Sequence, residues 1–206
     1  MELINKAKVK FSVDLDYYFR KYEDLSILEK RAIPLVRGDI LDVGCATGYY
    51  VPALTHYGNV DAIDISEEAI EIAKEKGIKE CHVADIFKYN PMIRYDTITL
   101  FENNIGLAGT LRKTNKMFRI LAKLLKDEGY IIAIIRHIDY KKRFYSSKYK
   151  VVWKGKIRKG FRWFYFNINY LPKFFSKFDL EMEILDKDID EGRTMYLIKI
   201  IHTNKS

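Results

Sequence analysis

The stretch that decides the fold is LDVGCATGYY, residues Leu41–Tyr50. It overlaps the apolar run DILDVG, which lies between Gly38 and Gly44 and is typical of a strand buried on both faces. Gly44 and Gly48 then precede a segment with helical character. Glycine lets a backbone turn sharply and approach a ligand closely. The stretch therefore predicts a strand-to-helix turn of the kind at which open α/β sheets bind ligands.

On both sides of this turn, strand-like and helix-like stretches alternate. Further strands are predicted at residues 59–66, 80–86, 95–101, 130–137, 180–188 and 194–202, and helices at 48–58, 66–77, 110–129 and 171–178. The first forty residues are predicted to be helical, and Ser26 with Glu29 fits a capping box. The alternation predicts an α/β fold with a doubly wound, seven-stranded, mostly parallel sheet and an antiparallel final strand.

The composition predicts one domain. The 206 residues, 48% of them hydrophobic, suffice for a single core, so residues 1–206 are expected to form one unit. No apolar run reaches the roughly 18–20 residues of a membrane span, and the first residues lack a signal-peptide core, so we expect a soluble, cytoplasmic protein. Cys45 and Cys81 are predicted to be buried thiols. The absence of glutamine, with many Lys, Ile and Glu residues, is typical of thermophile proteins.

The net charge of +8 is concentrated in one region. Residues 136–178 contain thirteen lysines and arginines against one acid, Asp139, so this region carries about +12 and the remainder about −4. Within it, residues 137–170 interrupt the alternation of strands and helices and are rich in aromatic residues. We predict that they form a basic, aromatic insertion with one or two extended segments.

The glycine spacing at the first turn separates two classes of nucleotide site. NAD-binding turns have the pattern G-x-G-x-x-G, which Gly44, Ala46 and Gly48 do not match. The remaining string, acid-x-Gly-x-Ala-x-Gly, resembles motif I of the class I S-adenosylmethionine (SAM) dependent methyltransferases. The resemblance implies a Rossmann-like methyltransferase fold, a cofactor turn that also includes Asp42 and Cys45, and conversion of SAM to S-adenosylhomocysteine (SAH).

Two further acids follow strands in the order that this resemblance implies. Asp64, followed by Ile65, ends the second strand and matches the acid that binds the ribose hydroxyls. Asp85 ends the third strand and matches the acid that receives the adenine amino group, with Ile86 placed to pack on the ring. Asp64 could instead cap the next helix, but Ser66 already fits that role. No metal is expected, because His, Cys and acidic residues show no metal-site spacing.

The segment LFENNIGLAG follows the fourth strand and is similar to that of a group of small, mostly uncharacterised SAM-dependent methyltransferases. The resemblance implies that Phe101 lies at the cofactor and that Glu102, Asn103 and Asn104 face the methyl group, where they orient an acceptor or take its proton. Alternatively, the asparagines only shape the turn. No Pro-Pro motif or cysteine follows this strand, which argues against two large classes of nucleic-acid methylase.

Two segments are predicted to cover the site. Residues 1–37 would form a helical lid in which Tyr17 and Tyr18 close over the cofactor, as in similar enzymes, or an ordinary amphipathic helix. The 137–170 insertion has three interpretations: a substrate cover, an RNA-binding surface, or a small extra sheet with an aromatic core and solvated lysines. As a cover, it would bind substrate through Arg143, Arg158, Arg162 and Trp163.

Together these features predict a SAM-dependent methyltransferase that acts on nitrogen or oxygen of a small molecule, for which an anionic group is one option. Methyl transfer requires mainly that the acceptor be aligned with an activated methyl group, so the lack of a catalytic triad is not evidence against activity. The alternatives are an RNA methyltransferase that uses the basic insertion and a non-catalytic SAM-binding partner protein. No membrane partner is expected.

Overall fold

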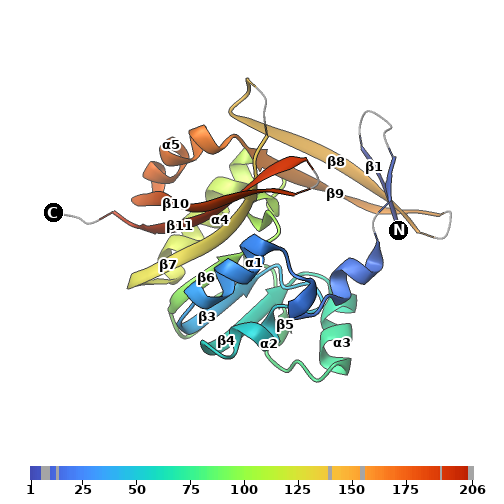
Figure 1. Cartoon of the computed structure of the whole chain (residues 1–206), viewed down its shortest axis with the longest axis horizontal. Helices are drawn as coiled ribbons and strands as arrows, with labels where there is room; N and C mark the ends of the chain where they lie inside the picture. The colour runs from blue at the N-terminus through green and yellow to red at the C-terminus, as the bar shows by residue number, and fades with distance from the viewer. Residues whose placement is uncertain (6–9, 13, 139–140, 154–155, 191, 204–206) are drawn as a thin grey trace.

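The computed structural model describes the chain except for residues 6–9, 13, 139–140, 154–155, 191 and 204–206. For residues 2, 10–12, 153, 158 and 159 it describes the backbone alone. Figure 1 shows a main sheet with helices on both sides and a long hairpin that extends toward the start of the chain.

The main sheet has seven strands in the order β10-β11-β7-β6-β3-β4-β5. Neighbouring strands from β5 to β7 are parallel, β11 is antiparallel to β7, and β10 is antiparallel to β11. The predicted fold, including its antiparallel final strand, is confirmed. The strands are β3 (Gly38–Val43), β4 (Gly58–Asp64), β5 (Cys81–Val83), β6 (Tyr95–Leu100), β7 (Leu125–Arg136), β10 (Leu180–Asp190) and β11 (Arg193–His202).

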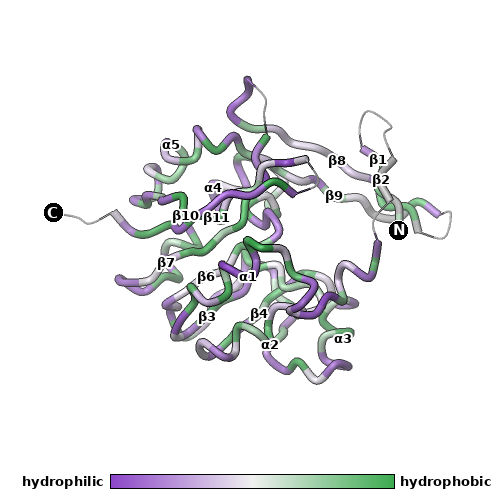
Figure 2. The backbone as a smooth tube through the Cα atoms, in the orientation of Figure 1, coloured by the Kyte–Doolittle hydropathy of each residue, from purple (hydrophilic) through white to green (hydrophobic). Residues whose placement is uncertain are grey.

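Hydrophobic clusters cover both faces of this sheet. Leu41 belongs to the cluster that α4 and α5 cover, and its neighbour Ile40 belongs to the one that α1, α2 and α3 cover. Alternate strand residues face opposite sides, so a sheet covered on both faces needs continuous apolar runs such as that of β7 (Figure 2). The helices are α1 (Ile27–Ala32), α2 (Val51–Leu54), α3 (Glu67–Glu75), α4 (Leu111–Leu124) and α5 (Leu171–Phe175).

A second, antiparallel sheet joins the start of the chain to the insertion. Its order is β2-β1-β8-β9, with β1 (Glu2–Asn5), β2 (Lys10–Ser12), β8 (Phe144–Trp153) and β9 (Lys156–Phe166). β1 pairs with β8 over the register Glu2↔Val152 to Asn5↔Tyr149. The insertion is therefore a hairpin, and one end of it packs into the main core through the buried Phe164 and Phe166.

The prediction that residues 1–37 are helical is wrong at the start of the chain. The segment contains strands β1 and β2 and then the 3₁₀ turns η1 (Leu15–Phe19), η2 (Tyr22–Asp24) and η3 (Ile33–Leu35). Pairing with β8, which lies far along the chain, determines β1, and a local pattern cannot reveal such a partner. The capping box of Ser26 and Glu29 at α1 is confirmed.

The boundary between α4 and β7 also differs from the prediction. The helix expected to run to Gly129 ends at Leu124, because Leu125 already pairs with Tyr95 as the first residue of β7. The remaining 3₁₀ turns are η4 (Asn104–Gly106), η5 (Ile168–Tyr170) and η6 (Ser176–Phe178). Within the described residues, no helix has both the length and the apolar character needed to cross a bilayer.

Candidate active site

The turn after β3 holds three residues in left-handed backbone conformation. The φ angles are +83° at Gly44, +50° at Ala46 and +73° at Gly48. This conformation costs an alanine about 1–2 kcal/mol. A hydrogen bond from the N–H of Ala46 to Asp64 Oδ2 (3.0 Å) offsets part of that cost, while Asp64 Oδ1 accepts from the N–H of Ser66 (2.9 Å). Asp64 therefore both fixes the turn and supports the start of α3.

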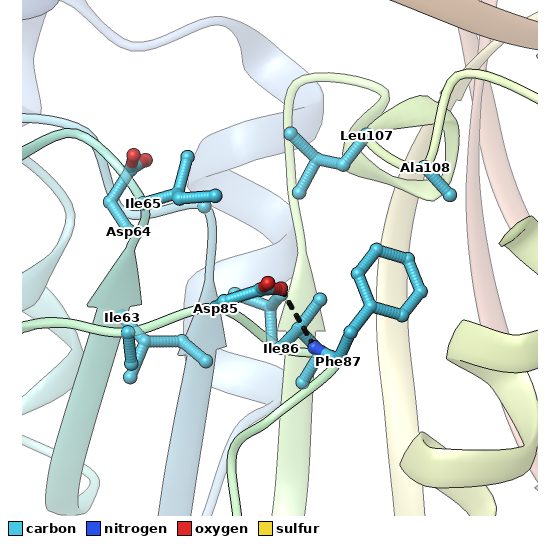
Figure 3. A pocket seen from close by; sticks show the side chains of 11 residues that line it. Ile63, Asp64, Ile65, Asp85, Ile86, Phe87, Leu107 and Ala108 are labelled. Carbon is cyan, nitrogen blue, oxygen red and sulfur yellow. Dashed lines mark hydrogen bonds between the residues drawn. The ribbon is translucent and has the colours of Figure 1, made fainter.

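A small apolar cavity of about 110 Å³ lies beyond the ends of β3, β4 and β5 (Figure 3). Asp64 and Asp85 contribute its carboxylates, and Asp85 Oδ1 accepts a hydrogen bond from the N–H of Phe87 at 2.9 Å. Ile86 is buried, whereas Ile65 is 71% exposed. An apolar slot with two carboxylates suits a planar heterocycle that carries hydrogen-bond donors. The lining is Val43, Gly44, Ile63, Asp64, Ile65, Ala84, Asp85, Ile86, Phe87, Leu107 and Ala108.

A larger cavity, of about 670 Å³, is lined by residues of both sheets and of η1. Gly44 lines both cavities, so the two meet at the turn after β3. Glu102, Arg136 and Arg193 are the charged side chains among the described lining residues. The aromatic lining comprises Tyr17, Tyr18, Tyr49, Tyr145, Tyr149, Phe161, Trp163 and Tyr165, and the remaining residues are Leu3, Gly44, Ala46, Asn103, Ile138 and Met195.

Glu102 lies between the large cavity and a neighbouring cavity of about 250 Å³. Its backbone is left-handed, with φ +51°. Burial, together with the nearby carboxylate of Glu29, raises the pKa of Glu102 to about 7. The hydroxyl of Tyr50 donates to Glu102 Oε1 at 3.4 Å, and a guanidinium nitrogen of Arg20 lies 3.5 Å from the same atom. A carboxyl group that titrates near neutral pH is suited to accept a proton from a substrate.

Arg20 interacts more closely with Glu29 than with Glu102. Its two terminal nitrogens donate to the Glu29 carboxylate at 3.2 and 2.9 Å, and that side chain is 1% exposed. Glu29 also accepts from the Tyr50 hydroxyl and from the N–H of Ser26. Burial alone would raise the pKa of Glu29, but the bond from Tyr50 and the charge of Arg20 lower it. Glu29 therefore stays ionised, and Glu102 is the carboxyl that titrates near neutrality.

The two predicted catalytic asparagines occupy different positions. Asn103 is buried and lines the large cavity with φ +59°; its Oδ1 accepts from the N–H of Arg136 at 3.1 Å, and its Nδ2 has no partner among the described residues. Asn104 donates from Nδ2 to the carbonyls of Val43 (2.9 Å) and Gly44 (3.1 Å). Asn104 therefore shapes the turn after β3, which is the alternative role given for the asparagines above.

Three side chains that were predicted to bind cofactor, those of Asp42, Cys45 and Phe101, are buried. Asp42 is 1% exposed, its Oδ1 accepts from the Thr99 hydroxyl at 2.6 Å, and burial raises its pKa to about 6. Cys45 is a buried thiol, and Phe101 packs edge-on against Tyr50 with 5.0 Å between ring centroids. None of the three side chains belongs to the described lining of either cavity.

The hairpin places its predicted substrate residues on different sides. Trp163 lines the large cavity, whereas the neighbouring Arg162 is exposed, because alternate strand residues face opposite sides. Arg143 is exposed as well and lies outside the described lining. The side chain of Arg158 lies outside the described part of the structure.

The arginines that line the cavity, Arg136 and Arg193, were not predicted. Burial raises the pKa of Tyr165, whereas the positive charges of Arg136 and Arg193 lower it. Both charges therefore lie near the Tyr165 hydroxyl. Tyr149 shares a hydrogen bond of 3.1 Å with Tyr165. The signal that could have found the arginines is the pairing of β7 with β11, in which Arg136 lies opposite Met195. Arg20, Glu29 and Tyr49 were also missed as site residues.

Among the described residues, no group of three or more His, Cys, Asp and Glu side chains is placed to hold a metal ion. The site therefore consists of a heterocycle-sized slot, a turn with accessible backbone, and an aromatic chamber with one titratable carboxyl group and two arginines. Such a chamber can exclude water from a reacting group and hold it beside a ligand in the slot.

Sequence and fold comparisons agree on the class of fold. Residues 40–129 match the model of a family described as a methyltransferase domain. No curated protein matches the sequence. The structure of a SAM-dependent methyltransferase from Bacteroides fragilis in complex with SAH superposes with a TM-score of 0.84 at 22% identity, over 98% of this chain and 86% of that one.

Two further solved structures share the fold at lower similarity. A SAM-dependent methyltransferase from Clostridium acetobutylicum has a TM-score of 0.59 at 22% identity, over 87% of this chain and 94% of that one. The sugar N-methyltransferase KedS8 from Streptoalloteichus has a TM-score of 0.61 at 16% identity, over 93% and 94%. The chain therefore has the class I methyltransferase fold, and residues 40–129 match a methyltransferase domain model.

Proposed function

We propose that this protein is a SAM-dependent methyltransferase that methylates nitrogen or oxygen of a small molecule enclosed in the large cavity. The observation that carries the proposal is the junction of the two cavities at Gly44. One cavity has the size and polarity for an adenosine-like group, and the other is an aromatic chamber of about 670 Å³, within the range of small-molecule sites.

The residues present fit SAM. The small cavity would hold the adenine between Ile86 and Leu107, with Asp85 toward its amino group and Asp64 toward the ribose. At the turn, a Cβ on Gly44 would stand 2.6 Å from Asn104 Nδ2, so glycine is needed for the backbone to lie where it does. When bound, SAM supplies an electrophilic methyl group on a sulfonium. The chain's own residues have only to position the acceptor and exclude water.

The acceptor is proposed to be a small molecule because of where the hairpin aromatics lie. An RNA-binding surface needs aromatic rings exposed as stacking platforms beside basic side chains. Here Tyr149, Trp163 and Tyr165 line the cavity and are at least half-buried, while Arg162 and Lys148 are exposed on the hairpin. The fold shared with the sugar N-methyltransferase KedS8 supports a small-molecule acceptor as well. A merely regulatory SAM-binding role is less consistent with so large a cavity beside the turn.

Two measurements test this function. Calorimetric titration with SAH should give a Kd that is independent of added RNA. Incubation with methyl-labelled SAM and fractionated cell extract should label the small-molecule fraction and leave RNA unlabelled. Label in RNA, together with RNA binding that weakens steeply as salt rises, would support the RNA alternative. SAH binding without label in any fraction would support a non-catalytic role.

A further inference from the structure

The wall of the large cavity carries one carboxyl group, that of Glu102, and two arginines, Arg136 and Arg193; Glu102 and Arg136 both also line the 250 Å³ cavity. Glu102 adjoins Arg20, Glu29 and Tyr50, at the boundary with the 250 Å³ cavity. The positive charges of Arg136 and Arg193 both lower the pKa of the Tyr165 hydroxyl on β9. A ligand that contacts both Glu102 and the two arginines is therefore complementary to the cavity when it carries a positively charged or proton-donating group and an anionic group.

We infer that the methyl acceptor is a small primary or secondary amine that also bears an anionic oxygen group, with its nitrogen beside Glu102 and its anion at Arg136 and Arg193. This inference rests on the proposed methyltransferase function. It goes beyond that function by choosing nitrogen over oxygen and by assigning roles to two arginines of the main sheet.

The choice of nitrogen follows from the proton chemistry. A protonated amine has no lone pair available, so it must lose a proton before it is methylated. With its pKa at about 7, Glu102 can accept a proton from an alkylammonium ion, but it is far too weak a base to deprotonate an aliphatic hydroxyl group. The described lining of the large cavity contains no His or Lys that could act as a base instead. Aromatic walls also stabilise a cation before the proton leaves.

The groups around Glu102 favour this role. Arg20 and Tyr50 form their shorter bonds with Glu29. The Glu29 carboxylate therefore largely neutralises the positive charge of Arg20, which stabilises ionised Glu102 only weakly. The other titratable side chains that line the cavities beside Glu102, among the described residues, are Tyr17 and Tyr18 of η1, Asp24, Tyr49, Arg136 of β7, Tyr145 and Tyr149 of β8, Tyr165 of β9, Asp188 and Asp190 of β10, and Arg193 of β11. Tyrosines stay neutral in this range because burial raises the pKa values of Tyr17, Tyr18 and Tyr49.

The reaction then balances without a further reactant. The ammonium nitrogen gives one proton to the Glu102 carboxylate, and the nitrogen lone pair forms a bond to the methyl carbon of SAM. The bond from sulfur to that carbon breaks, and its electron pair goes to sulfur, leaving SAH. For a primary amine, the product is a secondary ammonium ion that keeps two N–H protons, and Glu102 releases the transferred proton to water.

Binding measurements with SAH present test the inference without any turnover. The probe is glucosamine 6-phosphate, with glucose 6-phosphate as the hydroxyl counterpart and glucosamine as the probe without phosphate. We expect glucosamine 6-phosphate to bind at least tenfold more tightly than either. The ammonium should also lower the pKa of Glu102, so at pH 7 its binding should release about half a proton more than glucose 6-phosphate does, measured by calorimetry in buffers of different ionisation enthalpy.

Variants separate the two halves of the site. Glu102→Gln should abolish the extra proton release, and Arg136→Gln or Arg193→Gln should weaken binding of glucosamine 6-phosphate tenfold or more while SAH affinity stays within threefold. Glu71→Gln on α3 and Arg112→Gln on α4 are exposed controls expected to behave as wild type. Equal affinity for the amine and the hydroxyl probe, or proton release that persists in Glu102→Gln, overturns the inference. Loss of SAH binding by the wild-type protein would instead overturn the proposed function.

Discussion

The N–H of Ala46 donates a hydrogen bond of 3.0 Å to Asp64 Oδ2, and this bond joins the turn after β3 to the end of β4. The same carboxylate lines the small cavity. A carboxylate has about four lone-pair sites, so Asp64 can hold the turn and still accept hydrogen bonds from a ligand. Its two roles predict that one substitution affects both cofactor affinity and local stability.

Asp64→Ala should weaken SAH binding by about 1.5–3 kcal/mol, because charge-assisted hydrogen bonds to the ligand are lost. Isothermal titration calorimetry with SAH measures the effect. The matched control is Ser66→Ala, which removes the helix cap formed by Ser66 Oγ and the N–H of Ala69 (3.2 Å) and should destabilise the protein by about 1 kcal/mol. The control should keep its affinity for SAH. An unchanged Kd in Asp64→Ala would show that this acid does not bind the ribose.

Gly44→Ala should destabilise the protein by about 2–4 kcal/mol, because two effects add. The φ angle of +83° is unfavourable for alanine, and the new Cβ would stand 2.6 Å from Asn104 Nδ2 and 2.8 Å from Leu107 Cδ1. Gly77→Ala is the matched control: φ is also +83°, but nothing lies within 4 Å of the added Cβ. It should cost only about 1 kcal/mol in urea unfolding. Equal losses in both variants would mean that contact with the Asn104 loop is unimportant.

The sequence was sufficient to predict the main sheet because its signals are local. Continuous apolar runs, the Ser66 cap and the glycines of the first turn all act over a few residues, and the alternation of strands and helices predicts a mostly parallel sheet. The strands at the start of the chain were not predicted, because β1 is stabilised by pairing with β8, about 145 residues away. Nothing in ELIN itself indicates that partner.

The candidate site likewise has one part that local sequence signals predict and one part that they do not. Asp64 and Asp85 follow their own strands directly, so their position beside one cavity could be predicted. The second cavity is built from η1, the hairpin and β11, which meet only in the folded chain. Prediction therefore selected Arg143, Arg158 and Arg162 of the insertion, and it overlooked Arg136 and Arg193, which line the cavity from the main sheet. Composition identifies a basic segment, but strand pairing decides which charges reach the cavity.

Asp42 should make the protein less stable as the pH rises. Burial raises its pKa from 3.8 to about 6, and its Oδ2 has no partner among the described residues. The folded state therefore binds this proton more tightly than the unfolded state does. The resulting stabilisation is complete below about pH 3.8 and is lost as the pH rises through about 6. A shift of about two pKa units corresponds to about 3 kcal/mol.

Asp42→Asn isolates this contribution, since the amide has the same shape and does not titrate. Urea unfolding of both proteins at several pH values measures the difference in free energy of unfolding. That difference should move in favour of the variant by about 2.4 kcal/mol between pH 4 and about 7.5. A difference that stays constant over this range would contradict the burial of an ionisable Asp42.

Gly106→Ala should loosen the hairpin from the main sheet. A Cβ on Gly106 would stand 2.1 Å from the carbonyl oxygen of Phe164 and 2.7 Å from Trp163 Nε1, so β9 must move away from η4. The clash is with backbone, which cannot rotate aside, and the expected loss of stability is about 1–3 kcal/mol. Hydrogen exchange should show lower protection in the paired residues of β8 and β9, with protection retained in β3 and β6. Gly77→Ala, far from the hairpin, should leave its protection unchanged. If the hairpin of Gly106→Ala keeps full protection, the close packing of β9 on η4 is not what holds the hairpin against the main sheet.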